Sequence, residues 1–324
     1  MKKRRIICLA LALSLCFILA ATGCGNSNKE YPSESIELVI PASAGGGSDI
    51  MARLLVQIIQ DEKLCPQIIT PVNKAGGGGS AGQAYVNSKS DPNYTLFTIN
   101  DAHTIAATVS NTRPEGNFTP ICMLAKDEVL IVTSASSPYQ TIDDAIAAIQ
   151  ANPKSLTVGC ADQLDKICVY DINTSYGVEF NNVYFDSAGE IATAIMGGHV
   201  EFGIFNPSEC ASLVEGGELK ALATFATERC AAPLDDVPTF TELGHSDLVF
   251  AMSRGIMGPA GMSEEAQKYW SDIFETVCTN DDWVVGYVEA NGLTPYFMGC
   301  DEYTTYYEQN EQTLIEKATI LGEI

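Results

Sequence analysis

The sequence predicts an α/β protein with two domains. Short β-rich runs alternate with amphipathic stretches, which is typical of a parallel or mixed sheet covered by helices. The chain has 324 residues and remains long enough for two ordinary domains after an N-terminal leader is removed. The turns between the runs are rich in Gly, Ser, Asn and Asp, which expose backbone amides or cap helices.

The N-terminus predicts an export signal. Residues 2–5 are basic, and the apolar run at 6–21 is shorter than the roughly 20 residues that span a membrane. The ending Ala21-Thr22-Gly23-Cys24 resembles the lipoprotein box, in which cleavage precedes a cysteine that carries lipid. We therefore expect a lipoprotein signal peptide over 1–23, a lipidated Cys24 and a flexible linker over 24–34. A plain signal peptide with a chance cysteine and a transmembrane anchor are the alternatives.

Composition excludes some partners and leaves the cysteines open. The net charge is −23, which argues against nucleic acid because phosphates need a basic face. Eight cysteines follow Cys24, and either disulfides or free thiols are compatible with export. No C-x-x-C, H-x-x-x-H or convincing carboxylate cluster occurs, so we expect neither a metal nor a cofactor.

The expected elements follow one another in order. Strands are expected in runs that are mainly β-branched, aromatic or otherwise apolar: 35–40, 67–72, 95–99, 128–133, 155–159, 181–185, 201–205, 219–225 and 248–258. Helices are expected where apolar residues recur with helical spacing or a cap residue begins the segment: 49–59, 141–151, 163–175, 187–196, 207–215, 263–279, 281–290 and 301–320.

Ligands in such sheets bind beyond the carboxyl ends of the strands, where five turns are polar. These turns are PASAGGGSD (41–49), NDAHT (100–104), GCADQLD (159–165), FDSAGE (185–190) and FNPSE (205–209). The first is a glycine-rich turn that leads into a helix, an arrangement that binds anions through backbone N–H groups and the positive helix end. We expect the five turns to line one cleft.

A second glycine cluster, NKAGGGGSAGQAY (73–85), matches two enzyme patterns. Gly77-x-Gly79-x-x-Gly82 fits a dinucleotide fingerprint, and Gly78-x-Ser80-x-Gly82 fits the nucleophile elbow of α/β-hydrolases. Export disfavours a nicotinamide cofactor, and no strand runs directly into Ser80. We therefore expect a flexible loop at the cleft rim.

These pieces, in this order, resemble the substrate-binding proteins of tripartite tricarboxylate transporters, also called the Bug family. The resemblance is carried by IELVIPASAGGGSDIMARLL, VNKAGGGGSAGQAY, NYTLFTIN, NFTPICMLAKDEVLIV, YQTIDDAIAAIQANPKSLTVG, MGGHVEFGIFN, GGELKALATFATER, DDVPTFTELG and IMGPAGMSEEA. It covers nearly all of the chain after the leader, at family spacing.

The resemblance implies a two-lobed periplasmic-binding-protein fold of the Venus-flytrap, type II-like kind. Each lobe would be a mixed sheet flanked by helices, and the chain would cross between the lobes twice. Lobe 1 would comprise 35–121 plus 222–324, and lobe 2 would comprise 122–221. The protein would act as a monomer.

The resemblance also implies a site in which backbone amides and ordered waters hold a carboxylate. Asp49 is expected to orient a water or cap the helix, because a carboxylate is a poor direct partner for an anion. The implied ligand-binding residues in the first lobe are Ser43, Ala44, Gly45, Gly46, Gly47, Ser48, Asp49, Asn100, Asp101 and His103. Those in the second lobe are Gly159, Cys160, Asp162, Gln163, Tyr184, Asp186, Ser187 and Asn206.

Two turns depart from the family pattern. The turn that follows 155–159 is usually rich in Ser and Gly but here carries Asp162 with Asp165 close behind, and the turn after Tyr184 carries Asp186. Carboxylates that face the cleft would disfavour a dianion and favour an amino acid or a neutral or cationic metabolite. Lys74-Ala75 also replaces the common Arg-Pro.

The function expected from the resemblance is capture of a small organic acid, a carboxylate or an amino acid, for a membrane permease. The protein would be lipid-anchored on the extracytoplasmic face, would not be an enzyme, and would use no cofactor. A secreted α/β-hydrolase that uses Ser80 is one alternative. A sensor component that binds the same solute is the other.

Overall fold

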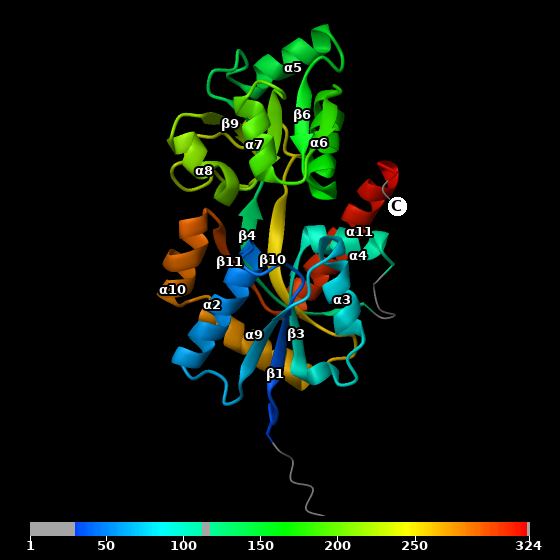
Figure 1. Cartoon of the computed structure of the whole chain (residues 1–324), viewed down its shortest axis with the longest axis vertical. Helices are drawn as coiled ribbons and strands as arrows, with labels where there is room; N and C mark the ends of the chain where they lie inside the picture. Colours follow the sequence, from blue (N-terminus) through cyan, green and yellow to red (C-terminus); the bar gives the residue numbers. More distant parts are fainter. Residues whose placement is uncertain (1–29, 112–116, 323–324) are drawn as a thin grey trace, which may run out of the picture. The chain divides into compact units, whose positions relative to one another are not determined.

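Two sheets form the framework of the computed structural model, which describes residues 30–111 and 117–322 (Figure 1). The predicted signal peptide and Cys24 lie outside these ranges. Residues Glu34–Ile324 form one structural unit that contains both sheets. No helix among the described residues is both long and apolar enough to span a bilayer.

The first sheet has six strands in the order β11-β4-β10-β3-β1-β2. Its strands are β1 (Ile36–Ile40), β2 (Ile69–Asn73), β3 (Thr95–Asn100), β4 (Thr119–Glu128), β10 (Ala251–Gly258) and β11 (Thr294–Met298). β1 runs parallel to β2 and β3, whereas β10 is antiparallel to β3 and β4, and β11 is antiparallel to β4. The sheet is therefore mixed.

The second sheet has five strands in the order β7-β6-β8-β5-β9 and is also mixed. Its strands are β5 (Leu130–Ser134), β6 (Thr157–Cys160), β7 (Asn181–Tyr184), β8 (Phe202–Phe205) and β9 (Leu219–Thr224). β6 is parallel to β7 and β8, and β5 is antiparallel to β8 and β9.

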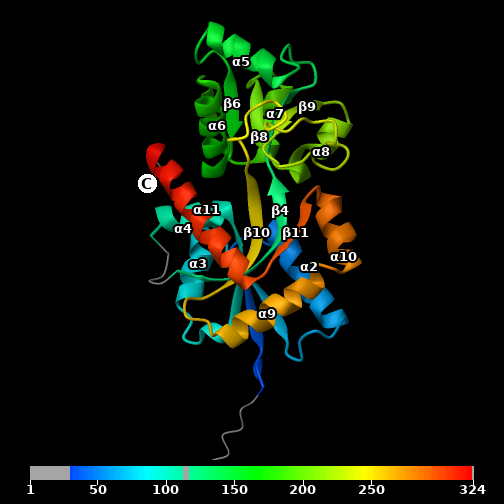
Figure 2. The same ribbon diagram turned by 180° about the vertical axis from the view of Figure 1, so that it is seen from behind.

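Helices accompany each sheet. Those of the first are α2 (Gly47–Asp61), α3 (Ser80–Asn87), α4 (Asp101–Val109), α9 (Glu264–Val277), the short α10 (Asp281–Trp283) and α11 (Cys300–Ile320). Those of the second are α5 (Ile142–Ala151), α6 (Gln163–Tyr176), α7 (Ala188–Met196) and α8 (Pro207–Glu215). Single turns at η1 (Gly77–Gly79), η2 (Pro92–Tyr94), η3 (Val284–Val288) and η4 (Glu289–Asn291) complete the described helical segments. Figure 2 brings α11 to the front, where it packs against β4.

The chain crosses between the sheets twice. Only Val129 separates β4 from β5, and the return runs from the end of β9 to the start of β10. The expected lobe boundaries at 121/122 and 221/222 both fall inside strands, because β4 continues to Glu128 and β9 to Thr224. In the structure, the chain therefore passes from one sheet to the other later than the predicted lobe boundaries. The division into two lobes stays a prediction.

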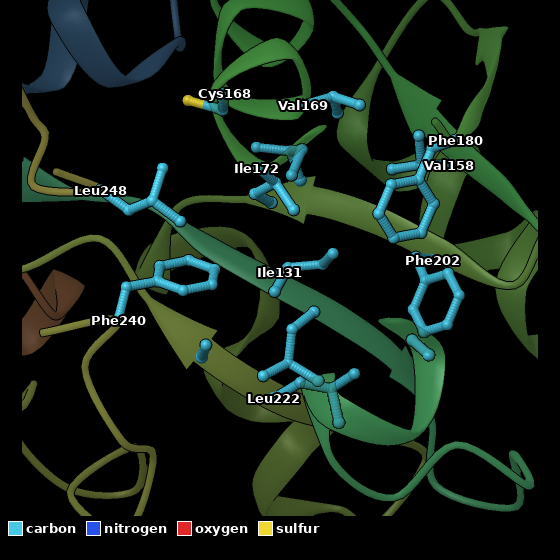
Figure 3. Close-up of a cluster of buried hydrophobic side chains, with 14 of the residues drawn as sticks. Ile131, Val158, Cys168, Val169, Ile172, Phe180, Phe202, Leu222, Phe240 and Leu248 are labelled. Atoms are coloured by element: carbon cyan, nitrogen blue, oxygen red, sulfur yellow. The ribbon is translucent and has the colours of Figure 1, made fainter. Parts of the chain in front are cut away.

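The core of the second sheet explains why the return segment belongs with that sheet. Phe225, Phe240 and Leu248 lie in one apolar cluster with Ile131 of β5 and Phe202 of β8 (Figure 3). Burial of such side chains stabilises the fold by about 25 cal/mol for each Å² of apolar area removed from water. The segment after β9 is thus held on the second sheet by its apolar side chains.

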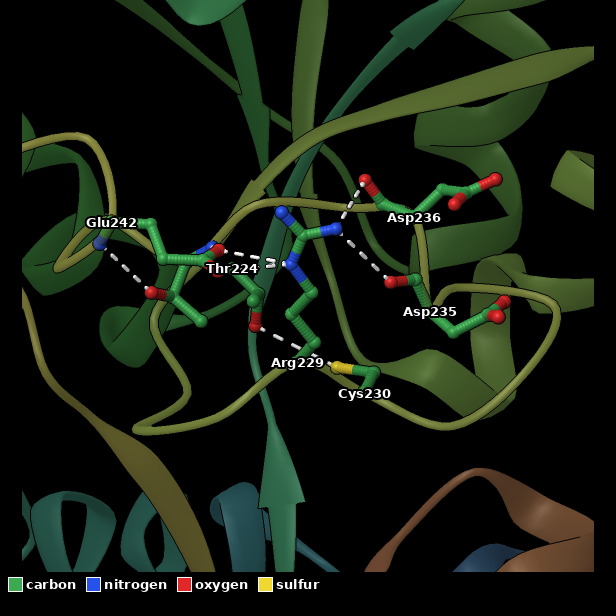
Figure 4. Close-up of polar contacts among 7 residues, drawn as sticks. Thr224, Arg229, Cys230, Asp235, Asp236 and Glu242 are labelled. Carbon is green, nitrogen blue, oxygen red and sulfur yellow. Dashed lines mark hydrogen bonds and ion pairs between the residues drawn. The ribbon is translucent and has the colours of Figure 1, made fainter.

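Arg229 organises the polar side of the same return segment. Its Nε donates to both carboxylate oxygens of Glu242, at 3.1 and 3.0 Å, and its Nη1 lies 3.4 Å from the backbone oxygens of Asp235 and Asp236 (Figure 4). Glu242 also accepts from the Thr239 amide at 2.8 Å. One arginine therefore links three parts of an irregular segment.

The eight cysteines among the described residues are free thiols. This state holds for Cys65, Cys122, Cys160, Cys168, Cys210, Cys230, Cys278 and Cys300. Burial raises the pKa of the Cys210 and Cys278 thiols to about 12. These two cysteines therefore behave as small apolar side chains and not as nucleophiles.

Gly203 sets how closely α7 approaches the second sheet. Gly159 and Gly203 are paired across β6 and β8, and a Cβ on Gly203 would lie 2.5 Å from Ile191 Cγ2 of α7. We predict that Gly203→Ala lowers the free energy of unfolding by about 1–3 kcal/mol through overpacking. Gly189→Ala, on α7 itself, meets nothing closer than 3.9 Å and is the matched control. Urea unfolding measures both, and equal stabilities for the two variants would contradict the packing argument.

Candidate functional site

A cavity of about 320 Å³ lies where turns of the first sheet meet the start of α6. Five predicted site residues line it: Ser43, Asn100, His103, Asp162 and Gln163. They come from the β1–α2 turn, the start of α4 and the start of α6, so residues about 120 positions apart in sequence are brought together. A larger cavity of about 550 Å³ on the second sheet contains none of the predicted residues, so we place the candidate site in the smaller one.

Asp49 fixes the shape of the glycine-rich β1–α2 turn. Its carboxylate accepts from the Gly45 amide at 2.8 Å, from Arg53 Nε at 3.0 Å and from Asn73 Nδ2 at 2.9 Å. The Arg53 hydrogen bond is the largest influence on Asp49 and lowers its pKa to about 2 against burial. Gly45 has a φ of +82°, a conformation that favours glycine. Asp49 therefore acts on the turn itself by accepting from Gly45, while the N-cap residue Gly46 has no side chain to cap the helix. The expectation that Asp49 orients a water or caps the helix stays a prediction.

The remaining residues of this turn present backbone and not side chains. Gly46 is the N-cap of α2, and its amide lies 3.3 Å from the Ser43 oxygen. The exposed Ala44 precedes Gly45 in the turn. Gly47 and Ser48 form the first turn of a 15-residue helix, where N–H groups have no intrahelical acceptor. This helix end is the part of the turn that suits an anion.

At the start of α4, Asn100 and Asp101 serve the fold. Asn100 Oδ1 accepts from the His103 amide at 2.9 Å and caps the helix. Asp101 is buried and accepts from the amide and hydroxyl of Ser253 at 2.8 and 2.9 Å and from Asn310 Nδ2 at 2.8 Å. Burial raises the pKa of Asp101 to about 6 despite these bonds. Its carboxylate joins α4, β10 and α11.

His103 is the buried polar side chain of the cavity. It is 8% exposed, and its Nδ1 has no hydrogen-bond partner among the described residues. Burial, followed by the nearby positive charge of Arg254, lowers its pKa to about 4, so the ring is neutral at pH 7. His103 therefore lines the cavity as a neutral ring whose Nδ1 is itself buried and has no hydrogen bond among the described residues.

Asp162 and Asp165 close the turn before α6. Asp162 is the N-cap and accepts from the amides of Leu164 and Asp165 at 2.8 and 3.1 Å. Asp165 accepts from the Ala161 amide at 2.7 Å. Two of the three acids that depart from the family pattern therefore occupy amides that would otherwise be open to a ligand.

The other predicted residues of the second sheet differ in burial and in the groups that they offer to the site. Cys160 is fully buried in the apolar core, and the space beside Gly159 is filled by Ile191, so these two positions offer only backbone to the site. Tyr184 is 60% exposed, with Lys166 Nζ 4.4 Å from its ring centroid. Ser187 caps α7.

Asp186 and Asn206 complete the predicted set. The amide of the exposed Asp186 donates to Glu190 Oε2 at 3.2 Å. Asn206 Nδ2 donates to the Glu128 backbone oxygen at 2.8 Å and so joins the start of α8 to the end of β4. The Asn206 amide donates to Glu209 Oε2 at 2.9 Å.

Sequence reasoning missed Arg254, Asp127 and Tyr287. Arg254 of β10 forms an ion pair with the fully buried Asp127 of β4, and its charge influences Asp101, His103 and Glu209. Tyr287 donates to the Gly47 oxygen at 3.2 Å. The available signal was an arginine inside the otherwise apolar run AMSRGIMG (251–258).

The structure corrects the expected flexible loop at 73–85. Gly77–Gly79 form a single turn and Ser80 begins α3, because the glycines adopt positive φ angles and allow the chain to enter the helix at once. Ser80 is 7% exposed, and no hydrogen bond to His103 is found within the described ranges. The His103 ring instead lies over Gly79, where a Cβ would meet Cδ2 at 2.5 Å.

We predict that Asp49→Asn destabilises the protein by about 1–2 kcal/mol at neutral pH, because the charged acceptor of three hydrogen bonds is lost. A lowered pKa means that the contribution is present above pH 3.8 and is lost as pH falls towards about 2. Urea unfolding from pH 7 to 3 should show a steady difference that shrinks below pH 4. Asp61→Asn, at the other end of α2, is the control, and a difference independent of pH would contradict the assignment.

We predict that His103→Asn flattens the pH dependence of stability. The folded pKa lies below the unfolded one, so the unfolded state binds more protons between about pH 4 and 6.5, and wild-type stability rises across that window. The rise attributable to His103 is at most about 3 kcal/mol. Unfolding free energies at pH 4.5, 5.5 and 7 measure it, with the exposed His199→Asn as control. Parallel curves for wild type and His103→Asn would refute the burial argument.

Comparison with known proteins identifies the family. Residues 51–320 match the family of tripartite tricarboxylate transporter family receptors. A Cupriavidus necator protein, "UPF0065 protein in gbd 5'region", is 27% identical over 306 residues, 92% of each chain. A TctC solute-binding protein from Polaromonas superposes with a TM-score of 0.75 at 23% identity, covering 89% of this chain and 99% of that one. The structure of R. palustris Rpa4515 with adipate gives a TM-score of 0.73 at 21% identity, covering 90% and 99%.

These structures have the periplasmic-binding-protein fold, and the expected fold class is confirmed. The chain belongs to the tripartite tricarboxylate transporter receptor family, whose members are extracytoplasmic solute-binding proteins.

Proposed function

We propose that this receptor captures a small organic acid, a carboxylate or an amino acid, and delivers it to the permease of a tripartite tricarboxylate-type transporter. It would be tethered to the extracytoplasmic face of the membrane through a lipidated Cys24, after removal of residues 1–23. It would act as a monomer whose two lobes, 35–121 plus 222–324 and 122–221, close on the ligand.

The cavity at the start of α6 is the observation that carries this proposal. It is lined by turns of both sheets and contains His103 with an unused ring nitrogen. The amides of Gly47 and Ser48 supply an anion-binding helix end beside it. A neighbour of the same fold has been solved with adipate, a small carboxylate, which supports this class of ligand.

We propose a role for each predicted residue from its position in the structure. Ser43, Asn100, His103, Asp162 and Gln163 would meet the ligand directly. Asp49, Asp101, Ser187 and Asn206 would hold the turns in place. Ala44 to Ser48, Gly159 and Cys160 would offer backbone groups, and Tyr184 and Asp186 would lie at the rim.

Thermal-shift measurements with small acids test the proposal. A ligand that binds only the folded state stabilises by RT ln(1 + [L]/Kd), which is about 2.7 kcal/mol at a hundredfold excess over Kd. We expect a rise in Tm with at least one carboxylate or amino acid, and a reduced rise for His103→Asn. No response to any member of a panel of dicarboxylates, tricarboxylates and amino acids would refute it.

A hydrolase that uses Ser80 is the alternative from another class, and a solute-binding sensor is the third possibility. Ester hydrolysis by the purified protein that disappears in Ser80→Ala would favour the enzyme over the binding protein. We expect no such activity, because Ser80 is buried at the start of α3 and finds no base among the described residues. A permease gene beside this one would favour transport over sensing.

A further inference from the structure

The guanidinium of Arg254 lies at the junction of the elements that form the candidate site. Arg254 sits in β10 at an irregularity in the pairing with β4, and its side chain is 14% exposed. Nε donates to Asp127 Oδ2 at 3.0 Å, and Nη2 donates to the same oxygen. Nη1 is directed elsewhere: a Cβ built on Gly47 would lie 4.0 Å from it. One end of the arginine is thus neutralised by Asp127, and the other lies beside the first turn of α2.

The ion pair leaves one donor group and one acceptor atom unused. Within residues 30–111 and 117–322, Asp127 Oδ1 has no hydrogen-bond partner of normal geometry although Asp127 is fully buried. Burial raises the pKa of Asp127, and the nearby Asn206 side chain only lowers it in part. No hydrogen bond from Arg254 Nη1 is found in the same ranges. A buried carboxylate oxygen without a partner is costly, so such atoms usually meet a ligand or a water. The pair therefore leaves a buried acceptor on Asp127 and a donor on the side of Arg254 that faces α2.

The ion pair lies beside the turn that lines the cavity, although Arg254 and Asp127 do not line the cavity themselves. Ser43, which lines the cavity, and Gly47, which faces Arg254, are in the same β1–α2 turn. The Arg254 charge also reaches His103 in the cavity. A ligand held at Arg254 can accordingly extend into the cavity.

The charges around Arg254 disfavour a ligand with several negative charges. Asp101 and Glu209 of α8 both interact electrostatically with Arg254. Glu209 also interacts with Asp127 and Asp162. One cation therefore faces several carboxylates. A dianion would be repelled by them, whereas a zwitterion brings no net charge and can place each of its charges opposite a partner.

We propose that the captured ligand is an α-amino acid, bound as a zwitterion beside the Arg254–Asp127 pair. Its carboxylate accepts from Arg254 Nη1 and the amides of Gly47 and Ser48, and its ammonium group donates to Asp127 Oδ1. Its side chain enters the cavity that contains His103. This inference rests on the proposed function and narrows its ligand class.

Isothermal titration of the purified protein tests the ligand class. The probes are the protein amino acids, malate, adipate and citrate, followed by the N-acetyl and carboxamide forms of the tightest amino acid. We expect at least one amino acid to bind more tightly than the three polycarboxylates. Each derivative should bind at least about tenfold more weakly, because each removes one charge-assisted hydrogen-bonding group.

Variants test the placement. Arg254→Met should weaken amino-acid binding at least about tenfold, through loss of a charged donor. Because it leaves Asp127 buried without its partner, the double variant Arg254→Met/Asp127→Asn, which removes both charges, is measured with it. Arg229→Met removes a guanidinium paired with Glu242 outside the site and should change the affinity by less than about twofold. Circular dichroism checks that each variant is folded.

The outcomes separate this inference from the proposed function. Binding of malate, adipate or citrate without binding of any amino acid would overturn the inference and leave the proposed function standing. Amino-acid binding that the folded double variant retains in full would overturn the placement beside Arg254. An absence of binding by every probe would overturn both.

Discussion

Carboxylates at the third position of four helices constrain the rest of the candidate site. Asp49 of α2, Asp165 of α6, Glu190 of α7 and Glu209 of α8 each accept from a backbone amide at or just before the helix start. This arrangement satisfies a donor that the helix cannot satisfy itself and holds the preceding turn in one conformation. It also offsets part of the positive helix end. The turns are thereby fixed in shape but are weaker attractors of anions than a glycine-rich turn alone would be.

Because these carboxylates offset the positive helix ends, the charge of Arg254 matters more for the electrostatics of the candidate site. The guanidinium of Arg254 supplies a largely buried positive charge beside Gly47. It can be buried only because Asp127 lies opposite it on the neighbouring strand. The same pairing allows the charged Asp127 to lie within β4 near the crossover, while Glu128 accepts from the Thr294 hydroxyl at 3.0 Å. The Arg254–Asp127 ion pair therefore has two consequences. It holds the charge that our proposal uses for ligand choice, and it stabilises the end of β4, where the chain crosses to the second sheet.

The sequence predicted most of the framework, and its failures have physical causes. Nine strands were expected near their observed positions because apolar residues mark them. β4 was missed because Pro120 and the charges at its end are typical of a turn, and only the contact with Arg254, 127 residues away along the chain, shows why they are buried. β11 was missed because its residues are only partly buried and carry Pro295. α3 was missed because four consecutive glycines indicate a loop unless their positive φ angles are known. α4 was missed because the polar residues of NDAHT indicate a turn, whereas Asn100 caps a helix there.

For the candidate site, the sequence predicted several turns that border the cavity but not the roles of their side chains. Gly, Ser, Asn and Asp at strand ends are a local signal, and residues of the turns 41–49, 100–104 and 159–165 line the cavity, whereas the expected turns 185–190 and 205–209 do not. The roles of their side chains were not found, because those roles depend on long-range partners. Asp101 illustrates the limit: its position at a strand end indicates a ligand contact, yet Ser253 and Asn310, both distant in sequence, take up its oxygens.

Apolar contact, and not polar recognition, positions the second side of the cavity. Ile105 of α4 and Leu314 of α11 pack with Leu164 and Ile167 of α6 in one buried cluster. Lys317 of α11 adds an ion pair with Asp171 of α6 at 2.6 Å. Apolar burial is non-directional and indifferent to ligand charge, so this cluster favours the contact between the helices whatever the site contains. Since α6 also carries Asp162 and Gln163 into the cavity, the core sets the positions of these polar groups, and under our proposal discrimination between ligands falls to the charges around Arg254.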